Sequence, residues 1–197
     1  MAVTTGILIF DEAEELDFVG PWEVFTYAAK FNDGDRVVTI AEEQRPIVCA
    51  KGLRVLPDHT FADAPPLDVV LVPGGIGTRS EVNNPTLIGW LRTVAPRCTW
   101  VTSVCTGALL LHEAGLAKGK RVTTHWSFVE TLRSRPDVTV VEGTRYVRDG
   151  NVVTSAGVSA GIDMALWLVG QLHGVDCARM VQRGIEYDPA PPYAADV

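Results

Sequence analysis

A cysteine stands at a sharp corner of the chain, between a run that predicts a strand and a run that predicts a helix. Cys105 lies in Ser-Val-Cys-Thr-Gly-Ala, residues 103–108. The five residues at 98–102 read as a buried strand, and residues 107–111 read as a helix start. Small residues two positions before and after the cysteine permit the tight turn of a nucleophile elbow, here with cysteine in place of serine. This context favours a reactive thiol over the inert, buried role that is common for a free cysteine.

The start of a helix also predicts how the thiol ionises. The helix dipole favours the thiolate of Cys105. A thiol with a pKa near 8.5 is about 3% ionised at pH 7, and a pKa of about 6 would make it about 90% ionised, a difference of about 3.4 kcal/mol. The dipole therefore predicts a lowered pKa for Cys105.

Asp17 is the candidate partner of this thiol. It lies between Leu16 and Phe18, just before the predicted helix start at Gly20. Burial there would raise the pKa of Asp17 and favour the protonated acid. An ionised Asp17 would oppose thiolate formation, so we expect it to titrate with Cys105 as a coupled pair and to donate its proton to the sulfur. The alternative is a structural carboxylate that caps the helix near Gly20.

A glycine-rich loop follows another predicted strand. Residues 72–78 read Val-Pro-Gly-Gly-Ile-Gly-Thr, so the backbone can approach a ligand closely and present N–H groups to it. No Gly-Lys-Ser/Thr follows, which disfavours a phosphate loop. We expect an oxyanion cradle in which the Gly75 amide faces the Thr106 amide, with Ile76 at the substrate. A plain glycine-rich turn is the alternative.

His125 and Trp126 follow a predicted strand at 122–124 and open a predicted helix. This position places them at the same edge of the sheet as Cys105. For His125 a chemical role and a structural role both stay open.

Length and composition limit the class of protein. The chain has 197 residues, 47% hydrophobic and 21% charged, which is typical of one globular domain, residues 1–197. The net charge of −7 disfavours a nucleic-acid partner. The first ten residues read as a strand and not as a signal peptide, and no apolar run is long enough to span a membrane. The four cysteines lack metal-ligand spacing, which predicts reduced thiols in the cytoplasm and no metal site.

Short apolar runs alternate with longer amphipathic ones, the pattern of an α/β sandwich with a mostly parallel sheet. Ligands bind such sheets beyond the carboxyl ends of the strands. Strands are predicted at 6–10, 36–41, 69–72, 99–103 and 151–155, and helices at 20–30, 85–94, 107–114, 125–134, 159–171 and 175–184. Hairpins or edge strands are expected at 47–54 with 58–61 and at 145–148 with 152–154, and an extended tail at 188–197.

Five segments together resemble the ThiJ/PfpI superfamily, in order and spacing over nearly the whole chain, and most of all its isonitrile (isocyanide) hydratase branch. The segments are 16–25, 72–75, 104–108, 123–126 and 186–189. The resemblance implies a flavodoxin-like three-layer sandwich of class I glutamine amidotransferase-like topology, and a homodimer.

The resemblance also implies residue roles. Cys105 is the reactive cysteine, and Asp17 is its acid partner in the position where many relatives carry glutamate. Thr106 follows the nucleophile as in the hydratase branch, whereas protease-like members have histidine there. The segment at 173–176 is a poor match to the amidotransferase motif.

The activity implied is a cofactor-free hydration of small organic isocyanides to N-formamides through a thioimidate on Cys105. Asp17 supplies the proton and then acts as the base for water, and Phe18 and Trp126 are pocket walls. The alternatives are thiol chemistry on an α-oxoaldehyde, which Asp17 disfavours, and a non-enzymatic ligand- or oxidation-sensing domain related to AraC-like regulators. The chain has no room for a C-terminal helix-turn-helix, so a regulator would need a separate partner.

Overall fold

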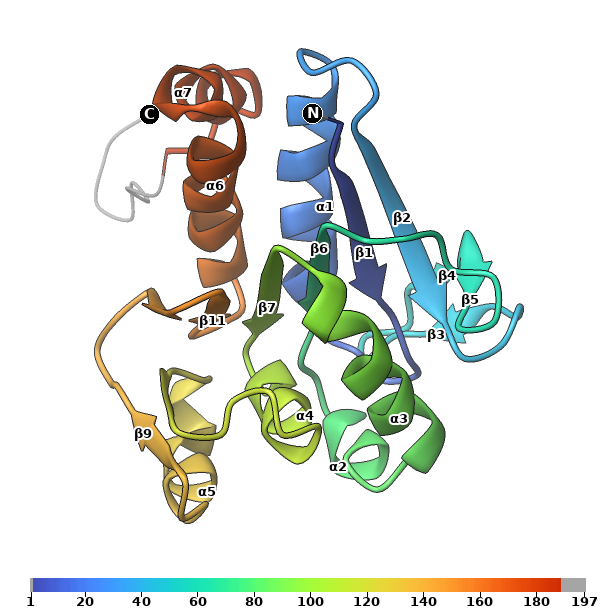
Figure 1. Ribbon diagram of the computed structural model, residues 1–197, viewed down its shortest axis with the longest axis vertical. Coiled ribbons are helices and arrows are strands. Elements are labelled where there is room, and N and C mark those ends of the chain that lie inside the picture. Colours follow the sequence, from blue (N-terminus) through green and yellow to red (C-terminus); the bar gives the residue numbers. More distant parts are fainter. Residues whose placement is uncertain (1, 189–197) are drawn as a thin grey trace.

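The computed structural model describes residues 2–188 and contains a seven-stranded sheet (Figure 1). The strand order is β10-β11-β7-β6-β1-β2-β5, and β10 alone runs antiparallel to its neighbour. The strands are β1 (Thr4–Leu8), β2 (Arg36–Ala41), β5 (His59–Thr60), β6 (Val69–Val72), β7 (Trp100–Val104), β10 (Tyr146–Asp149) and β11 (Val152–Ser155).

Two groups of helices flank this sheet (Figure 1). One group consists of α1 (Glu15–Ala29), α6 (Ala160–His173) and α7 (Val175–Gly184), which contact one another. The other consists of α2 (Thr78–Glu81), α3 (Pro85–Val94) and α4 (Gly107–Glu113). The predicted α/β sandwich with a mostly parallel sheet is therefore confirmed.

The central strands are apolar because helices cover both faces of the sheet. Every residue of β1, β6 and β11 is buried, as expected for parallel strands between two helical layers. Their side chains join those of α1 and α6 in one hydrophobic core.

Shorter elements lie outside the main sheet. β3 (Ile47–Val48) and β4 (Arg54–Val55) form an antiparallel hairpin, and β8 (Lys120–Val122) pairs with β9 (Val138–Val140). The 3₁₀ helix η1 (Ala95–Arg97) follows α3, and the 3₁₀ helix η2 (Trp126–Phe128) leads into α5 (Val129–Arg133).

Several elements differ from their predicted bounds or partners. The first helix begins at Glu15, so Pro21 lies inside α1 and not at its first position. The helix predicted at 125–134 is divided into η2 and α5. The hairpin partner of β3 is β4, whereas β5 is an edge strand that pairs with β2.

Strands 36–41 and 69–72 and helices 85–94 and 175–184 have the predicted bounds. Within residues 2–188, no helix has both the length and the apolar character that a membrane crossing requires. Residues 189–197 of the predicted tail lie outside the described residues.

Candidate functional site

The loops that follow β1, β6, β7 and β11 meet at one edge of the sheet, because these strands are parallel neighbours. The loop and first helical turn after β1 carry Asp17, and the loop after β6 carries Gly74 and Gly75. Cys105 directly follows β7, and Gly157 follows β11.

Cys105 has the strained backbone of an elbow. Its φ is 56°, in the left-handed region that side chains other than glycine rarely adopt. The Cys105 N–H donates to Ser155 O at 3.0 Å, and the Cys105 carbonyl accepts from Thr124 Oγ1 at 2.9 Å. These two bonds hold a conformation that would otherwise relax, the condition under which strain persists at functional sites.

Gly157 closes over the cysteine from the neighbouring strand. Its φ is 92°, and a Cβ atom there would lie 2.5 Å from the Cβ of Cys105. Only a residue without a side chain fits this approach. The residue was not singled out from the sequence, although a glycine directly after a strand was an available signal.

Asp17 lies in the first turn of α1 and is completely buried. Its Oδ2 accepts a hydrogen bond from the Gly74 N–H at 2.9 Å, so the carboxyl group binds the loop after β6. It does not cap the helix near Gly20, which was the structural alternative. Its Oδ1 is buried and accepts no well-aligned hydrogen bond from the described residues, although the Cys105 thiol is close enough to affect the carboxyl pKa.

The two titratable groups perturb each other. Burial raises the pKa of Asp17 from 3.8 to about 7, and the charge of Glu14 adds to the increase. The hydrogen bond from Gly74, the Cys105 thiol and the charge of Lys51 act in the opposite direction. Burial also raises the pKa of Cys105 to about 12, with a further contribution from the Asp17 charge.

The predicted lowering of the Cys105 pKa is therefore wrong. Hydrogen bonds from Thr106 favour the thiolate, but burial and the nearby carboxylate outweigh them. The pair titrates as a unit and holds one proton between the two pKa values of about 7 and about 12. Its resting form at pH 8 is a thiol beside a carboxylate.

Thr106 fastens the glycine loop to the elbow. The Gly75 N–H donates to Thr106 Oγ1 at 3.0 Å, and the Thr106 hydroxyl lies 3.2 Å from the Gly75 carbonyl. Thr78 Oγ1 lies 3.1 Å from the same hydroxyl. The Thr106 N–H is directed at the Cys105 sulfur. The predicted cradle of two free amides is not present, because the Thr106 side chain already occupies the Gly75 N–H.

A cavity of about 440 Å³ lies beside the elbow. Thr124 and Gly157 line it and also contact Cys105. Cys105 itself is only 7% exposed. The other lining residues are Thr123, His125, Trp126, Val129, Glu142, Gly143, Thr144, Arg145 and Ala156. Neither Cys105 nor Asp17 lines this cavity, which adjoins the elbow through Thr124 and Gly157.

Two of the remaining candidate site residues line this cavity, and two do not. His125 and Trp126 line it, with Trp126 81% exposed and the His125 Nδ1 2.8 Å from Ser127 Oγ. Phe18 is buried in the hydrophobic core and Ile76 is half exposed, and neither lines the cavity. The prediction of Phe18 as a pocket wall is wrong, because its side of α1 packs on the sheet.

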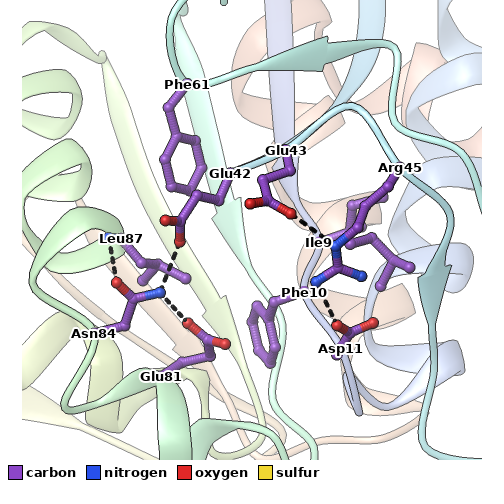
Figure 2. A pocket seen from close by; sticks show the side chains of 11 residues that line it. Ile9, Phe10, Asp11, Glu42, Glu43, Arg45, Phe61, Glu81, Asn84 and Leu87 are labelled. Carbon is purple, nitrogen blue, oxygen red and sulfur yellow. Dashed lines mark hydrogen bonds and ion pairs between the residues drawn. The ribbon is translucent and has the colours of Figure 1, made fainter.

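A second cavity, of about 230 Å³, lies beyond the ends of β1 and β2 (Figure 2). The side-chain amide of Asn84 bridges the carboxylates of Glu42 and Glu81 at 2.8 Å each, and Arg45 pairs with Asp11. Neither Asp17 nor Cys105 lines this space. Residues 2–188 contain no cluster of histidine, cysteine and acidic side chains that could hold a metal ion.

The model of the DJ-1/PfpI family matches residues 4–171. The chain belongs to this family. The match includes Asp17, Cys105 and Gly157, so the family region contains the whole site described above.

Individual relatives agree with this assignment. An isonitrile hydratase of Pseudomonas putida is 42% identical over 193 residues, 98% of this chain and 82% of that protein. A ThiJ/PfpI family protein of Pseudomonas syringae has a solved structure with a TM-score of 0.90 and 32% identity, over 100% of this chain and 80% of that one. The HTH-type transcriptional regulator CdhR of Pseudomonas aeruginosa is 30% identical over 84% of this chain but only 49% of its own length.

Proposed function

We propose that the protein is a cysteine-dependent hydratase that converts small organic isocyanides to N-formamides. The observation that carries the proposal is the buried pair of Asp17 and Cys105, which holds one proton at pH 8. The 42% identity to an isonitrile hydratase supports the choice of substrate class.

An isocyanide carbon needs one nucleophile and one proton, which is what this pair holds. Asp17 takes the thiol proton as the Cys105 sulfur bonds to the terminal carbon, and returns that proton to the same carbon. The S–H bond breaks, the C–S and C–H bonds form, and the product is a thioimidate on the enzyme. The raised pKa of Cys105 is compatible with this step because the base and the nucleophile are in contact.

The second half of the reaction uses water. The Asp17 carboxylate removes a proton from water as the water oxygen adds to the thioimidate carbon, and Asp17 then passes that proton to the imine nitrogen. The C–S bond then breaks, the hydroxyl proton passes to the sulfur, and the N-formamide leaves. The net reaction is the addition of one water to the isocyanide, and it uses no cofactor.

Thr106 has a positioning part in this proposal. Its N–H is directed at the sulfur, and its hydroxyl fixes the loop whose Gly74 N–H holds Asp17. Of the two amides that were expected to stabilise the substrate, the Thr106 N–H therefore favours the Cys105 thiolate, and the Gly75 N–H is bonded to the Thr106 hydroxyl.

The test is formamide production from para-nitrophenyl isocyanide by the wild type, Cys105→Ala and Asp17→Asn. We expect both variants to lose turnover. A circular dichroism spectrum that matches the wild type serves as the folding control for both variants. Turnover by Cys105→Ala would refute the mechanism.

Sensing is the alternative, and the observation in its favour is the regulator that is 30% identical over 84% of this chain. The thiolate is the form that peroxide oxidises, and burial raises the pKa of Cys105 to about 12. Mass spectrometry after mild peroxide treatment tests this alternative, and we expect little selective oxidation of Cys105. Glyoxalase activity without isocyanide turnover would instead support the α-oxoaldehyde alternative.

Two further expectations belong to the proposal. We propose a homodimer, for which the exposed apolar side chains Leu16, Val19 and Trp22 on α1 offer a surface. Light scattering on the wild type and on Val19→Glu tests this proposal. We also propose a cytoplasmic location, which the four free cysteines support.

A further inference from the structure

The cavity beside Cys105 has two residues of fixed charge in its wall, Glu142 and Arg145. Each of them is paired with a residue that does not line the cavity. Their arrangement therefore determines which substituents the cavity accepts.

Arg145 is neutralised from α6. Its Nε donates to Asp163 Oδ2 at 2.6 Å, and its Nη2 donates to Ser159 Oγ at 3.1 Å. Tyr187 donates its hydroxyl to the other oxygen of Asp163 at 3.0 Å, which fixes the carboxylate in place. The Arg145 carbonyl accepts from Ala156 N–H at 2.9 Å, directly beside the segment that contacts the nucleophile.

Glu142 is paired from α5 with an arginine that it shares with Glu130. Its Oε1 pairs with Nη2 of Arg133, whose Nη1 pairs with Glu130. Arg133 and Glu130 are both absent from the cavity wall.

Asp17 and Arg79 also lie outside this wall. Asp17 is buried behind the nucleophile, and Arg79 donates to the Gly75 carbonyl and packs over the Phe128 ring. Apart from the ionisable imidazole of His125, the remaining lining residues are uncharged.

We propose that this cavity selects an uncharged organic substituent, and that Asp163 and Arg133 determine this specificity by pairing with the two charges in its wall. The inference rests on the proposed function for the identity of the substrate, an isocyanide with a neutral substituent. A charged substituent that enters the cavity would lose its hydration and meet no unpaired opposite charge, so its binding is disfavoured. Removal of Asp163 should therefore favour an anionic substituent, and removal of Arg133 should favour a cationic one.

The experiment measures how fast Cys105 reacts with three methanethiosulfonates at pH 8, where histidine side chains are generally neutral. The reagents carry a methyl, a sulfonatoethyl or a trimethylammonioethyl group, so they are neutral, anionic or cationic. Peptide mass spectrometry reports modification at Cys105, and Cys105→Ala provides the blank. We expect the wild type to react fastest with the neutral reagent.

Two single variants give opposite expectations. Asp163→Asn frees the positive charge of Arg145 and should raise the anionic-to-neutral rate ratio by about three- to tenfold. Arg133→Gln frees the negative charge of Glu142 and should raise the cationic-to-neutral ratio by a similar factor. Both changes should shrink in 0.5 M salt, which a merely structural effect would not do.

The double variant Arg145→Gln/Asp163→Asn is the matched control, because it restores neutrality and should restore the wild-type ratios. Unchanged ratios in both folded single variants would overturn the proposal, and so would equal shifts toward both charged reagents. Arg133→Gln changes an exposed pair and tests the idea even if Asp163→Asn fails to fold.

The thiol readout is independent of isocyanide turnover. Shifted ratios without hydration by the wild type would support the selectivity and refute the proposed function. With turnover, para-carboxyphenyl isocyanide should gain kcat/KM relative to para-nitrophenyl isocyanide in Asp163→Asn.

Discussion

Asp17→Asn should make the protein more stable at pH 8 while it removes the proposed activity. The pKa of Asp17 is about 7 in the fold against 3.8 as its ordinary value, mainly because the carboxyl group is buried. At 1.36 kcal/mol per pKa unit, ionisation of this buried group costs about 4 kcal/mol of folding free energy.

The sign follows from proton binding. The folded chain binds the Asp17 proton more tightly than the unfolded chain, so the stabilisation by the protonated form is complete below about pH 4. It is lost as the pH rises through about 7. Asparagine has the shape of the neutral acid, and its Oδ1 can still accept from the Gly74 N–H. The variant should therefore match the wild type near pH 4 and exceed its stability by about 4 kcal/mol at pH 8.

Urea unfolding at pH 4, 5, 6, 7 and 8 measures this difference. With a slope of about 2 kcal/mol per M, the midpoint of the variant should lie about 2 M higher at pH 8. Asp63→Asn is the matched control, because hydrogen bonds from Thr60 lower the pKa of that exposed carboxyl and it stays ionised from pH 5 to 8. A stability difference between wild type and Asp17→Asn that does not change with pH would refute the reasoning.

Three other changes test the same site. The kcat/KM for isocyanide hydration should rise about tenfold per pH unit below 7 and level off above it, because the mechanism needs Asp17 ionised; a rate that falls over this range would contradict the assignment. In urea unfolding, Gly157→Ala should lower the free energy of unfolding by about 2–5 kcal/mol, because alanine is strained at this φ and its Cβ meets Cys105. The control Gly52→Ala has a similar φ of 93° but nothing within 4 Å, so it should lose only the part due to strain. Thr106→Val should lower the free energy of unfolding by about 1–3 kcal/mol, because it leaves the Gly75 N–H without an acceptor. It should also reduce kcat, and an unchanged kcat would show that catalysis does not need this hydrogen bond.

The fold could be predicted because its signals are local. β6 and β2 are short apolar runs between turn residues, and α3 begins with Asn84 as its cap and Pro85 at its first position. Small residues around Cys105 likewise indicated the sharp turn, which the structure shows as a φ of 56°. In each case a few neighbouring residues carry the information.

The electrostatics of the site could not be predicted in the same way. The dipole of α4 is a local property and suggested a lowered pKa for Cys105. Burial depends on what covers the residue, and here Gly157 approaches from a strand about fifty residues away in the sequence. For the same reason Phe18 was assigned to the pocket, although the packing of α1 on the sheet places it in the core.

In the proposed reaction, the buried carboxyl group of Asp17 lowers the stability of the fold and provides the base. An asparagine at position 17 could make the hydrogen bond to Gly74 without a charge, so the fold alone does not require an acid there. A pKa of about 7 gives a base that is ionised at neutral pH and still readily protonated, which is where general acid–base catalysis is most effective. Burial raises the pKa of Cys105, so the thiol keeps its proton beside the Asp17 carboxylate. Addition of a thiol to an isocyanide needs that proton on the carbon, so a pair that keeps one proton suits the reaction better than a free thiolate would.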